Sequence, residues 1–413
     1  MNVDEVVRAA LHEQAGEQRL PSPGFADRIL AVRRRRRIRT LASVATATVA
    51  VVAVAVAVPL LDSGHGSGTS DTQLASQANR SDIIAHPEQS PPRDLIAAGN
   101  TALAAYYTSK RVKDTPDKAV DRRVYGILDQ KTGKYVQQDR WSYVAVAPGM
   151  RTAAVLEGDL PARRIGLLDL FTGKVDRWIP VDHGVGAVTF SSDGGKLLAT
   201  TYKADPDLRF RKKYDANDDG KRDWEPALNS PRTGFYVLDV ASGKGSWSAV
   251  SHKPNKGYYP AEINARQDFG FSADGKLVWS GLAMDPGVRY YDFKGNEVAV
   301  PANEKHLSWF DGARLSPNGK LAAGGFAGGA TTTATQIIDP YTGKRLYKTP
   351  GQQQLVWVDN KRLIEWDIAP GSGEYHQHLV LVTIGNDKTV PLSGFLKGTD
   401  GNLARWTPVF AER

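Results

Sequence analysis

The distribution of hydrophobic residues divides the chain near position 94. Before that point, one apolar stretch without any charge occupies residues 41–61. After it, short runs of Val, Ile, Leu and aromatic residues alternate with clusters of Gly, Asp, Ser and Lys. A long apolar stretch is typical of a membrane-spanning helix, whereas short apolar runs bounded by turn residues predict β-strands. The sequence therefore predicts an anchor followed by an all-β domain at residues 94–413.

The apolar stretch is long enough to cross a bilayer. With a rise of about 1.5 Å per residue, a helix over residues 41–61 is about 30 Å long, which matches the hydrocarbon core. A run of arginines, Arg33–Arg37, precedes it, and the first basic residue after it is Arg80. The positive-inside rule then places residues 1–40 in the cytoplasm and the rest of the chain outside the membrane. We expect a single-pass protein of the cell membrane.

A cleaved secretory signal is the alternative interpretation of the apolar stretch. Ala55-Val56-Ala57 matches the small-residue pattern of a cleavage site. However, both the stretch and the segment before it are longer than signal peptides usually have. The pattern therefore favours a retained signal-anchor.

The segments that flank the predicted span differ in character. Apolar residues at helical spacing over positions 2–16 predict a short amphipathic helix within residues 1–40. This cytoplasmic segment is either a loosely ordered stub or a docking peptide for a cytoplasmic partner. Residues 62–93 are rich in Ser, Gly, Thr, Asp, Gln and Pro, and this composition predicts a flexible linker.

Within the predicted β-domain, a short β-run that ends in Asp recurs before a turn that contains Gly and usually Lys. Gly adopts the positive φ that such a turn needs, and Asp hydrogen-bonds the turn backbone. The copies are Ile127-Leu128-Asp129 with Gly133-Lys134, Leu167-Leu168-Asp169 with Gly173-Lys174, Val237-Leu238-Asp239 with Gly243-Lys244, Tyr290-Tyr291-Asp292 with Gly295, Ile337-Ile338-Asp339 with Gly343-Lys344, and a degenerate Leu381-Val382-Thr383 with Gly385.

A second turn motif alternates with the first. It places Ser, Asp or Asn, and Gly after an apolar residue, and it also predicts a tight turn between two strands. The clear copies are Phe190-Ser191-Ser192-Asp193-Gly194, Phe271-Ser272-Ala273-Asp274-Gly275 and Leu315-Ser316-Pro317-Asn318-Gly319, and weaker versions are Val146-Ala147-Pro148-Gly149, Trp357-Val358-Asp359-Asn360-Lys361 and Trp406-Thr407-Pro408. The two motifs alternate at intervals centred on the length of a four-stranded blade, about 40 to 50 residues.

On these two turn motifs, residues 94–413 resemble the bacterial β-propellers of the WD-repeat and TolB-like type. The whole chain is similar to membrane-anchored propeller proteins of bacterial cell surfaces. The resemblance implies radially arranged four-stranded blades, with ligands often bound at the central channel or on the top face. The chain departs from true WD repeats, because Leu, Tyr or Ile replaces the Trp before the Asp and the Gly-His pair is essentially absent.

The C-terminal end of the sequence indicates how the ring closes. The last repeat, Trp406 to Phe410, supplies one strand, and a one-stranded blade would leave sheet edges open. We expect the missing strands to come from residues 101–108 and 124–128, although the alanines of the first segment favour a helix. The predicted fold is an all-β, six-bladed propeller, with seven blades as the alternative, preceded by one transmembrane helix and a short cytoplasmic helical segment.

One interval between repeats contains an insertion, about residues 203–232, with a candidate calcium loop. Over nine residues it resembles the loops of EF-hand and dockerin type. Position twelve of such a loop is a bidentate Glu, but here it is Pro226, so a solvated acidic hairpin tip is an equal alternative. The candidate ligands are the side chains of Asp215, Asn217, Asp219 and Asp223 and the backbone carbonyl of Lys221.

Few other residues indicate metal binding or catalysis. His376 and His378 are two positions apart, which on a strand places both imidazoles on one face. No third metal ligand accompanies them in the sequence, so an ordinary polar face is favoured. No G-x-S-x-G, H-E-x-x-H, phosphate-loop or dinucleotide motif occurs. We therefore predict no catalytic residue and no cofactor other than calcium.

Charge and cysteine content exclude further classes. The 413 residues carry a formal net charge of +8 and no cysteine. The densest basic cluster adjoins the predicted span, where it orients the helix against anionic headgroups, so the charge does not indicate a nucleic-acid partner. The absence of cysteine excludes disulfides, thiolate metal sites and thiol nucleophiles.

These observations predict a non-catalytic binding or sensing propeller displayed outside the membrane. Its expected partners are the cytoplasmic membrane and an unknown protein or glycan ligand at the propeller face. The alternative is a membrane-tethered hydrolase or lyase that acts on a glycan, lactone or peptide, because propeller enzymes assemble their sites from dispersed residues. Polar groups that converge in the central channel would favour the enzyme.

Overall fold

The computed structural model describes residues 83–212, 222–227, 230–250, 266–282, 287–308, 311–329, 332–369, 376–396 and 405–413. These residues form strands and turns, with no helix among them. The chain divides into two compact units, Met1–Thr69 and Ser70–Arg413, and all of the described residues belong to the second. No helix suited to crossing a bilayer occurs in the described part, and the predicted cytoplasmic segment and span lie outside it.

The first sheet joins the two ends of the described unit. Its last strand pairs antiparallel with β3, so that Thr407 lies opposite Tyr107 and Glu412 lies opposite Thr101. The predicted closure is therefore confirmed, and the alanine-rich segment is a strand because both of its edges are paired. Among the described residues this sheet contains β1 (Ile83–Ile84), β2 (Ala97–Ala98), β3 (Thr101–Thr115), β4 (Lys118–Asp129), β5 (Lys134–Gln138), β11 (Leu208–Arg211), β12 (Trp224–Pro226) and β26 (Thr407–Glu412).

Folded structure reaches back into the predicted linker. Strand β1 lies within residues 62–93 and pairs with β2, where Ile84 is opposite Ala97. Ile84 also packs against the hydrophobic core of the first sheet. The pair Ile83-Ile84 is the apolar exception in a polar segment; Ile83 is exposed, whereas Ile84 is half-buried, and its contact with the core favours this strand.

The second sheet contains one long strand, β9, whose two halves pair with different strands. In β9, residues 174–180 pair with β8, whereas residues 185–190 pair with β10. A Cβ at Gly186 would lie 2.5 Å from the Tyr202 ring, so glycine is required where β9 passes this side chain. The described strands of the sheet are β6 (Trp141–Val146), β7 (Thr152–Glu157), β8 (Ala162–Asp169), β9 (Lys174–Phe190), β10 (Lys196–Tyr202), β13 (Arg232–Asp239) and β14 (Gly245–Ala249).

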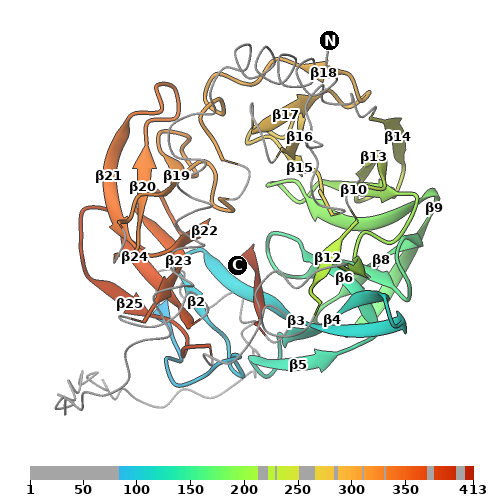
Figure 1. Ribbon diagram of the computed structural model, residues 1–413, viewed down its shortest axis with the longest axis horizontal. Helices are drawn as coiled ribbons and strands as arrows, with labels where there is room; N and C mark the ends of the chain where they lie inside the picture. Colours follow the sequence, from blue (N-terminus) through green and yellow to red (C-terminus); the bar gives the residue numbers. More distant parts are fainter. Residues whose placement is uncertain are drawn as a thin grey trace, which may run out of the picture. The chain divides into compact units, whose positions relative to one another are not determined.

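Three smaller antiparallel sheets complete the described unit. Figure 1 shows that the sheets follow one another in chain order around a centre, at which β26 lies. This is the arrangement expected of a β-propeller. The strands are β15 (Gly270–Phe271), β16 (Val278–Gly281), β17 (Val288–Tyr291) and β18 (Glu297–Val298); β19 (Ala322–Phe326), β20 (Ala334–Ile338) and β21 (Arg345–Pro350); and β22 (Gln353–Trp357), β23 (Arg362–Ile368), β24 (Gln377–Thr383) and β25 (Thr389–Pro391).

The hydrophobic core lies between neighbouring sheets. On one side of the first sheet, Tyr125 clusters with Val155 of β7. On its other side, Leu103 clusters with Ile364 and Trp366 of β23. The first sheet thus packs between the second and the last, and this burial stabilises the closure.

Both predicted turn motifs form tight turns. In the first motif, Asp169 Oδ1 accepts the backbone N–H groups of Phe171 at 2.8 Å and Thr172 at 2.7 Å, and Gly173 has a φ of 69°. In the second, Ser191 Oγ accepts the N–H of Lys196 at 2.9 Å, and the same bond recurs at Ser272 and Ser316. The turn predicted at Trp406-Thr407-Pro408 is wrong, because Thr407 and Pro408 are the first residues of β26.

The two motifs lie at the same end of the sheets, because antiparallel strands alternate in direction. Hydrogen bonds link neighbouring sheets there, from Gly149 N of one turn to Glu412 O at the end of β26, at 2.8 Å, and from Asn318 N to Asn360 Oδ1 of another turn, at 2.9 Å. We call this end the turn face; it comprises residues 129–134, 147–151, 169–174, 191–196, 239–244, 272–276, 292–296, 316–320, 339–345, 358–362 and 383–388.

The opposite end carries the insertion and is called the insertion face. Strands β10 and β13 pair directly, with Tyr202 opposite Arg232, although residues 203–231 separate them. The predicted insertion in the middle of a blade is therefore confirmed. Its strands β11 and β12 form a hairpin that pairs with β4, where Leu208 lies opposite Val120. The insertion thus connects the second sheet to the first.

One buried polar cluster links the last two sheets. The Glu365 side chain is fully buried, and its Oε2 accepts a hydrogen bond from the Thr335 hydroxyl at 2.8 Å. The hydroxyls of Thr335 and Thr349 lie 2.7 Å apart. Burial raises the pKa of Glu365 to about 8, because no described cation compensates its charge. This carboxyl therefore stays protonated at neutral pH.

Candidate ligand-binding cavity

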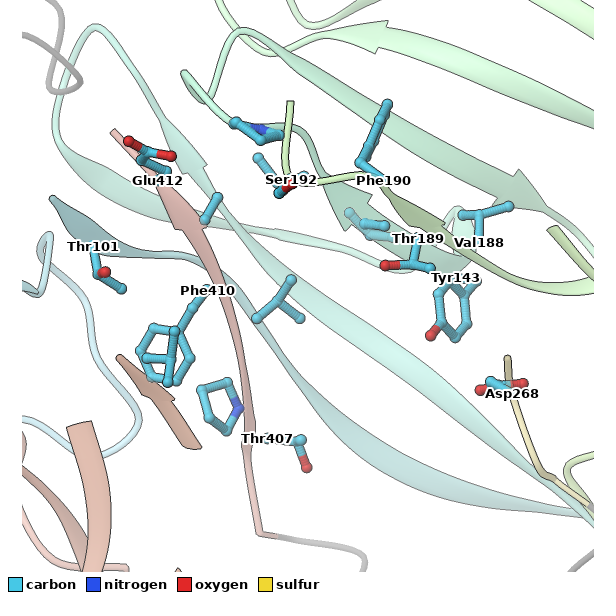
Figure 2. Close-up of a pocket in the computed structure, with 18 of the residues that line it drawn as sticks. Thr101, Tyr143, Val188, Thr189, Phe190, Ser192, Asp268, Thr407, Phe410 and Glu412 are labelled. Carbon is cyan, nitrogen blue, oxygen red and sulfur yellow. The ribbon is translucent and has the colours of Figure 1, made fainter. Parts of the chain in front are cut away.

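The strands nearest the centre enclose a cavity of about 650 Å³. This volume is within the range of ligand-binding pockets in proteins. Residues of β26, β6, β9 and β22 line it, together with the segment before β15. Figure 2 shows that the labelled side chains of Thr189, Tyr143 and Phe410 border the open space. Because the walls come from several sheets, the ring closure described above creates the site.

One part of the cavity wall is apolar. It includes Val188, Phe190, Val356, Trp357 and Phe410. Trp357 is nearly buried at 6% exposure, and its indole N–H points to the carbonyl of Arg314 at 3.3 Å. This wall offers surface to an aromatic or aliphatic part of a ligand.

The insertion-face end of the cavity contains two arginines that share one carboxylate. Arg123 donates two hydrogen bonds to Asp207, at 2.6 and 3.1 Å. Arg266 donates two more, at 2.8 and 2.7 Å. Asp207 belongs to the insertion, and its side chain is only 5% exposed. The insertion therefore supplies the anion that holds β4 and the segment before β15 together.

A second carboxylate completes this cluster. Arg266 Nη1 lies 3.0 Å from Asp268 Oδ2, and the Tyr202 hydroxyl donates to Asp268 at 2.7 Å. The two guanidinium charges are thus matched by the two carboxylates of Asp207 and Asp268. The insertion-face end offers hydrogen-bonding groups without a net charge.

Electrostatics stabilises the ionised form of this cluster. Burial by itself would raise the pKa of Asp207, but the adjacent charges of Arg266 and Arg123 hold that pKa well below its ordinary value. Burial and neighbouring Asp268 raise the pKa of Tyr143, so its phenol stays protonated and can donate a hydrogen bond. The Arg123 guanidinium also lies over the rings of Tyr107 and Tyr143, at 5.2 and 5.5 Å from their centroids.

The turn-face end of the cavity has a different lining. It is formed by Asn100, Pro148, Ser192, Pro317 and Glu412. Figure 2 places Glu412 at the opposite side of the view from Asp268. The hydroxyl of the neighbouring Ser191 is already used inside its turn, where it donates to Asp193 and accepts from Lys196. The lining carboxylates Glu412 and Asp268 are therefore separated by the length of the cavity.

The predicted calcium ligands lie almost entirely outside the described residues. This applies to Asp215, Asn217, Asp219 and Lys221, whereas Asp223 is described. The backbone carbonyl of Asp223 accepts the N–H of Lys212 at 2.7 Å, so Asp223 stands at the base of the β11–β12 hairpin. Within the described ranges, no three acidic or histidine side chains are grouped to hold a metal ion.

The two predicted histidines do lie together. The rings of His376 and His378 both stack on Phe395, with centroids 4.9 and 3.9 Å away. His376 Nδ1 lies 2.6 Å from the Leu396 carbonyl oxygen, and burial lowers the pKa of His378. These contacts explain both side chains as parts of an aromatic cluster at the end of β24.

The sequence motifs did not indicate the arginine cluster. Arg123, Asp207 and Arg266 are far apart in the chain, and each occurs in a segment without repeat features. The available signal was the position of Asp207 in an insertion, since an insertion that interrupts two paired strands must pack somewhere. Its partners were not predictable without the fold.

Comparisons with known proteins yield weak likenesses to propellers. No family model and no curated protein matches the chain. Among solved structures, TolB from Acinetobacter baumannii is 15% identical, with a TM-score of 0.36, over 70% of this chain and 67% of TolB. The Cps50 (Swd1) β-propeller domain of Myceliophteria thermophila is 13% identical, with a TM-score of 0.37, over 75% and 89%.

A third solved structure gives a similarly weak likeness. Hydrazine synthase from Kuenenia stuttgartiensis is 12% identical, with a TM-score of 0.32, over 63% of this chain and 68% of that one. All three TM-scores are low. The support for a propeller-like arrangement is the strand pairing of the chain itself.

Proposed function

We propose that the chain is a single-pass membrane protein that displays a non-catalytic, six-bladed β-propeller outside the membrane and binds a ligand in its central cavity. The observation that carries this proposal is the cavity of about 650 Å³, with one apolar wall and one charge-balanced polar end. Such a lining suits a protein or glycan ligand that has both apolar and hydrogen-bonding parts.

The strand pairing supports six blades. The first is β26-β3-β4-β5, and β9 divides the seven-stranded sheet into β6-β7-β8 with its first half and β10-β13-β14 with its second. The sheets β15–β18, β19–β21 and β22–β25 supply the other three. The remaining described strands extend the first sheet, since β1 and β2 continue from β3 and the β11–β12 hairpin pairs with β4, so none of them forms a separate sheet for a seventh blade.

Polar groups converge at the insertion-face end of the cavity, which by itself favours the enzyme alternative. We nevertheless favour binding, because the two arginines and two carboxylates of that end pair with one another, and the described lining contains no histidine. A membrane-tethered hydrolase or lyase would need a group free to exchange a proton near the substrate. Release of product from glycans, lactones or peptides by the purified chain would establish the enzyme instead.

Membrane anchoring is the part of this proposal that rests on sequence. Residues 41–61 are apolar and uncharged, and arginines precede them. We expect the full chain to stay with membranes through alkaline carbonate extraction. A variant that lacks residues 41–61 should be released, and a shortened mature chain in mass spectrometry would indicate cleavage.

The calcium loop remains a proposal for the β11–β12 connection. Its five candidate ligands are oxygen donors, which Ca²⁺ prefers. Titration calorimetry of the full chain with calcium should give binding heat that the Asp219→Ala variant lacks. Equal heat from both chains, or none from either, would favour the acidic hairpin tip.

Ligand capture tests the cavity. Thr189 borders the cavity, and a Thr189→Trp variant should fill part of it (Figure 2). The full-length chain should retain a component of a cell-surface extract that this variant fails to retain. The matched control is Ser246→Trp on the exposed outer strand β14, which should bind as the original chain does. Equal retention by all three chains would contradict the cavity as the site.

A further inference from the structure

The turn face carries a recurring layer of lysines that follows from the two motifs. Both motifs place Lys after the turn glycine, so the same residue type appears on sheet after sheet. On the turn face as a whole, Lys and Arg outnumber Asp and Glu. The exposed lysines of these turns are Lys131, Lys134, Lys174, Lys244, Lys276, Lys294, Lys320, Lys344, Lys361 and Lys388.

The aspartates of the same turns accept hydrogen bonds from the backbone of the turn. Asp239 Oδ1 accepts the Ser242 N–H at 2.7 Å, and Asp339 Oδ1 accepts the Thr342 N–H at 2.8 Å. Neither Asp239 nor Asp339 forms an ion pair with the lysine of its own turn among the described contacts. Several lysines of the described turns form no ion pair within 4 Å with a described acid. They are Lys174, Lys244, Lys294, Lys320, Lys344, Lys361 and Lys388.

These lysines share one surface because the turns of neighbouring sheets contact one another. Besides the contacts of Gly149 and Asn318, Gln130 donates to the Met150 carbonyl at 3.2 Å. Arg177 Nη1 donates to the Ala241 carbonyl at 2.9 Å. The cationic groups are therefore distributed around the ring and are not concentrated in one groove.

Apolar side chains accompany the lysines on this surface. Tyr341, at the tip of one turn, is 61% exposed, and Leu346 and Tyr347, in strand β21 that follows this turn, are 43% and 44% exposed. The Lys131 ammonium lies over the Phe171 ring, 4.8 Å from its centroid. Exposed tyrosines next to lysines are typical of residues at a membrane–water interface.

We infer that the turn face docks on an anionic lipid bilayer. Each unpaired lysine near an anionic surface contributes favourable electrostatic energy, and the effect adds over many dispersed residues. A nucleic acid would instead require a basic stripe or groove that follows its backbone. The scattered single charges with tyrosine and leucine side chains at the rim match a broad headgroup layer better.

Energy transfer in vesicles tests this orientation on the full chain. The chain contains no cysteine, so one introduced thiol can carry a donor dye. Ser192→Cys places the dye on the turn face, and Asp139→Cys places it on the loop before β6 at the insertion face; both positions are exposed. The acceptor is a headgroup-labelled lipid, in vesicles of phosphatidylcholine alone or mixed with phosphatidylglycerol.

Phosphatidylglycerol should increase transfer from position 192 much more than from position 139, and high salt should remove the increase. Any membrane anchor is common to both labelled chains, so the difference between them reports docking alone. Equal transfer from both positions, or no response to phosphatidylglycerol, would overturn the inference. So would docking of the turn face on duplex DNA without any response to the anionic vesicles.

Charge variants extend the test. Replacing Lys244, Lys320 and Lys344 by Gln should lower the association constant of the chain for the phosphatidylglycerol vesicles at least tenfold. The matched control replaces Lys110, Lys113 and Lys203, which are exposed residues of the insertion face, and should change it less than twofold. Circular dichroism should show the same fold for both variants. Equal losses in both variants would show that net charge alone drives association and would contradict a specific face.

Discussion

The turn face and the insertion face satisfy their charges in opposite ways. On the insertion face, Arg123 and Arg266 bind Asp207, which comes from a distant part of the chain. On the turn face, most aspartates bond the backbone of their own turn, as Asp169 does, and most of the nearby lysines form no ion pair with a described acid. Local bonds leave a face available for outside partners, whereas long-range ion pairs hold sheets together.

The largest effect should follow from removing Asp207. Asp207→Ala leaves two nearly buried guanidinium groups without their shared carboxylate, and loss of one partner of a buried pair costs about 3 to 5 kcal/mol. Chemical denaturation of the full chain measures this. The control is Asp159→Ala, which breaks an exposed pair with Arg122 on the same face and should cost at most about 1 kcal/mol. Similar costs for the two variants would remove the distinction between the faces.

The pH dependence of stability separates Asp207 from Glu365. The pKa of Asp207 is lowered by folding, so its stabilisation is present above its unfolded pKa near 4 and is lost as pH falls further. The pKa of Glu365 is raised from 4.5 to about 8, so the folded state keeps a proton that the unfolded state loses. Stability should therefore fall as pH rises from about 4.5 to 8.

Glu365→Gln removes this second effect. The variant should be more stable than the original chain by roughly 4 kcal/mol at pH 8 and about equally stable at pH 4, because Gln stays neutral. Denaturation curves at both pH values measure the difference. A variant that is less stable at pH 8 would show that Glu365 is ionised and compensated in the folded state.

A turn aspartate should have a smaller effect. Asp169→Ala removes an acceptor of two backbone N–H groups and of Arg151, which we expect to cost about 1 to 2 kcal/mol. Asp169→Asn keeps one oxygen acceptor and should cost about half as much. Thermal melting distinguishes them, and an equal loss for both would assign the effect to the charge of Asp169 and not to the turn bonds.

The smallest change in stability is expected for the turn-face lysines. Lys244, Lys320 and Lys344 replaced together by Gln should leave the free energy of unfolding within about 0.5 kcal/mol, because exposed side chains without partners contribute little. Chemical denaturation checks this. A loss of more than about 1 kcal/mol would show that these lysines have a structural role that the ion-pair pattern does not reveal.

The same contrast explains what the sequence could predict. The turns at Asp129, Asp169 and Asp339 depend on residues within five positions of each other, so their motif is visible in the sequence. The closure of β26 on β3 was predictable because a lone last strand needs a neighbour. By contrast, the contacts of Asp207 with Arg123 and Arg266 join residues 84 and 59 positions apart, and no local pattern encodes them.

In two further segments, the sequence pattern did not indicate the local structure. Trp406-Thr407-Pro408 resembles the second turn motif, but its residues start a strand because Thr407 pairs with Tyr107. Likewise, the polar composition of residues 62–93 concealed the short strand at Ile83–Ile84. In both segments a tertiary partner decides the local structure, which composition alone does not show.

Strand β9 has one further consequence. Without an intervening loop, its residues 174–180 pair with β8 and its residues 187–190 pair with β10, while Val185 pairs with both. A circular permutant with its new ends inside β9 would disturb the pairing with both neighbouring strands at once. New ends between β5 and β6, in the exposed loop at Asp139, would interrupt no strand. The chain should therefore tolerate new ends or an inserted domain at Asp139 better than within β9, where such changes should fail first.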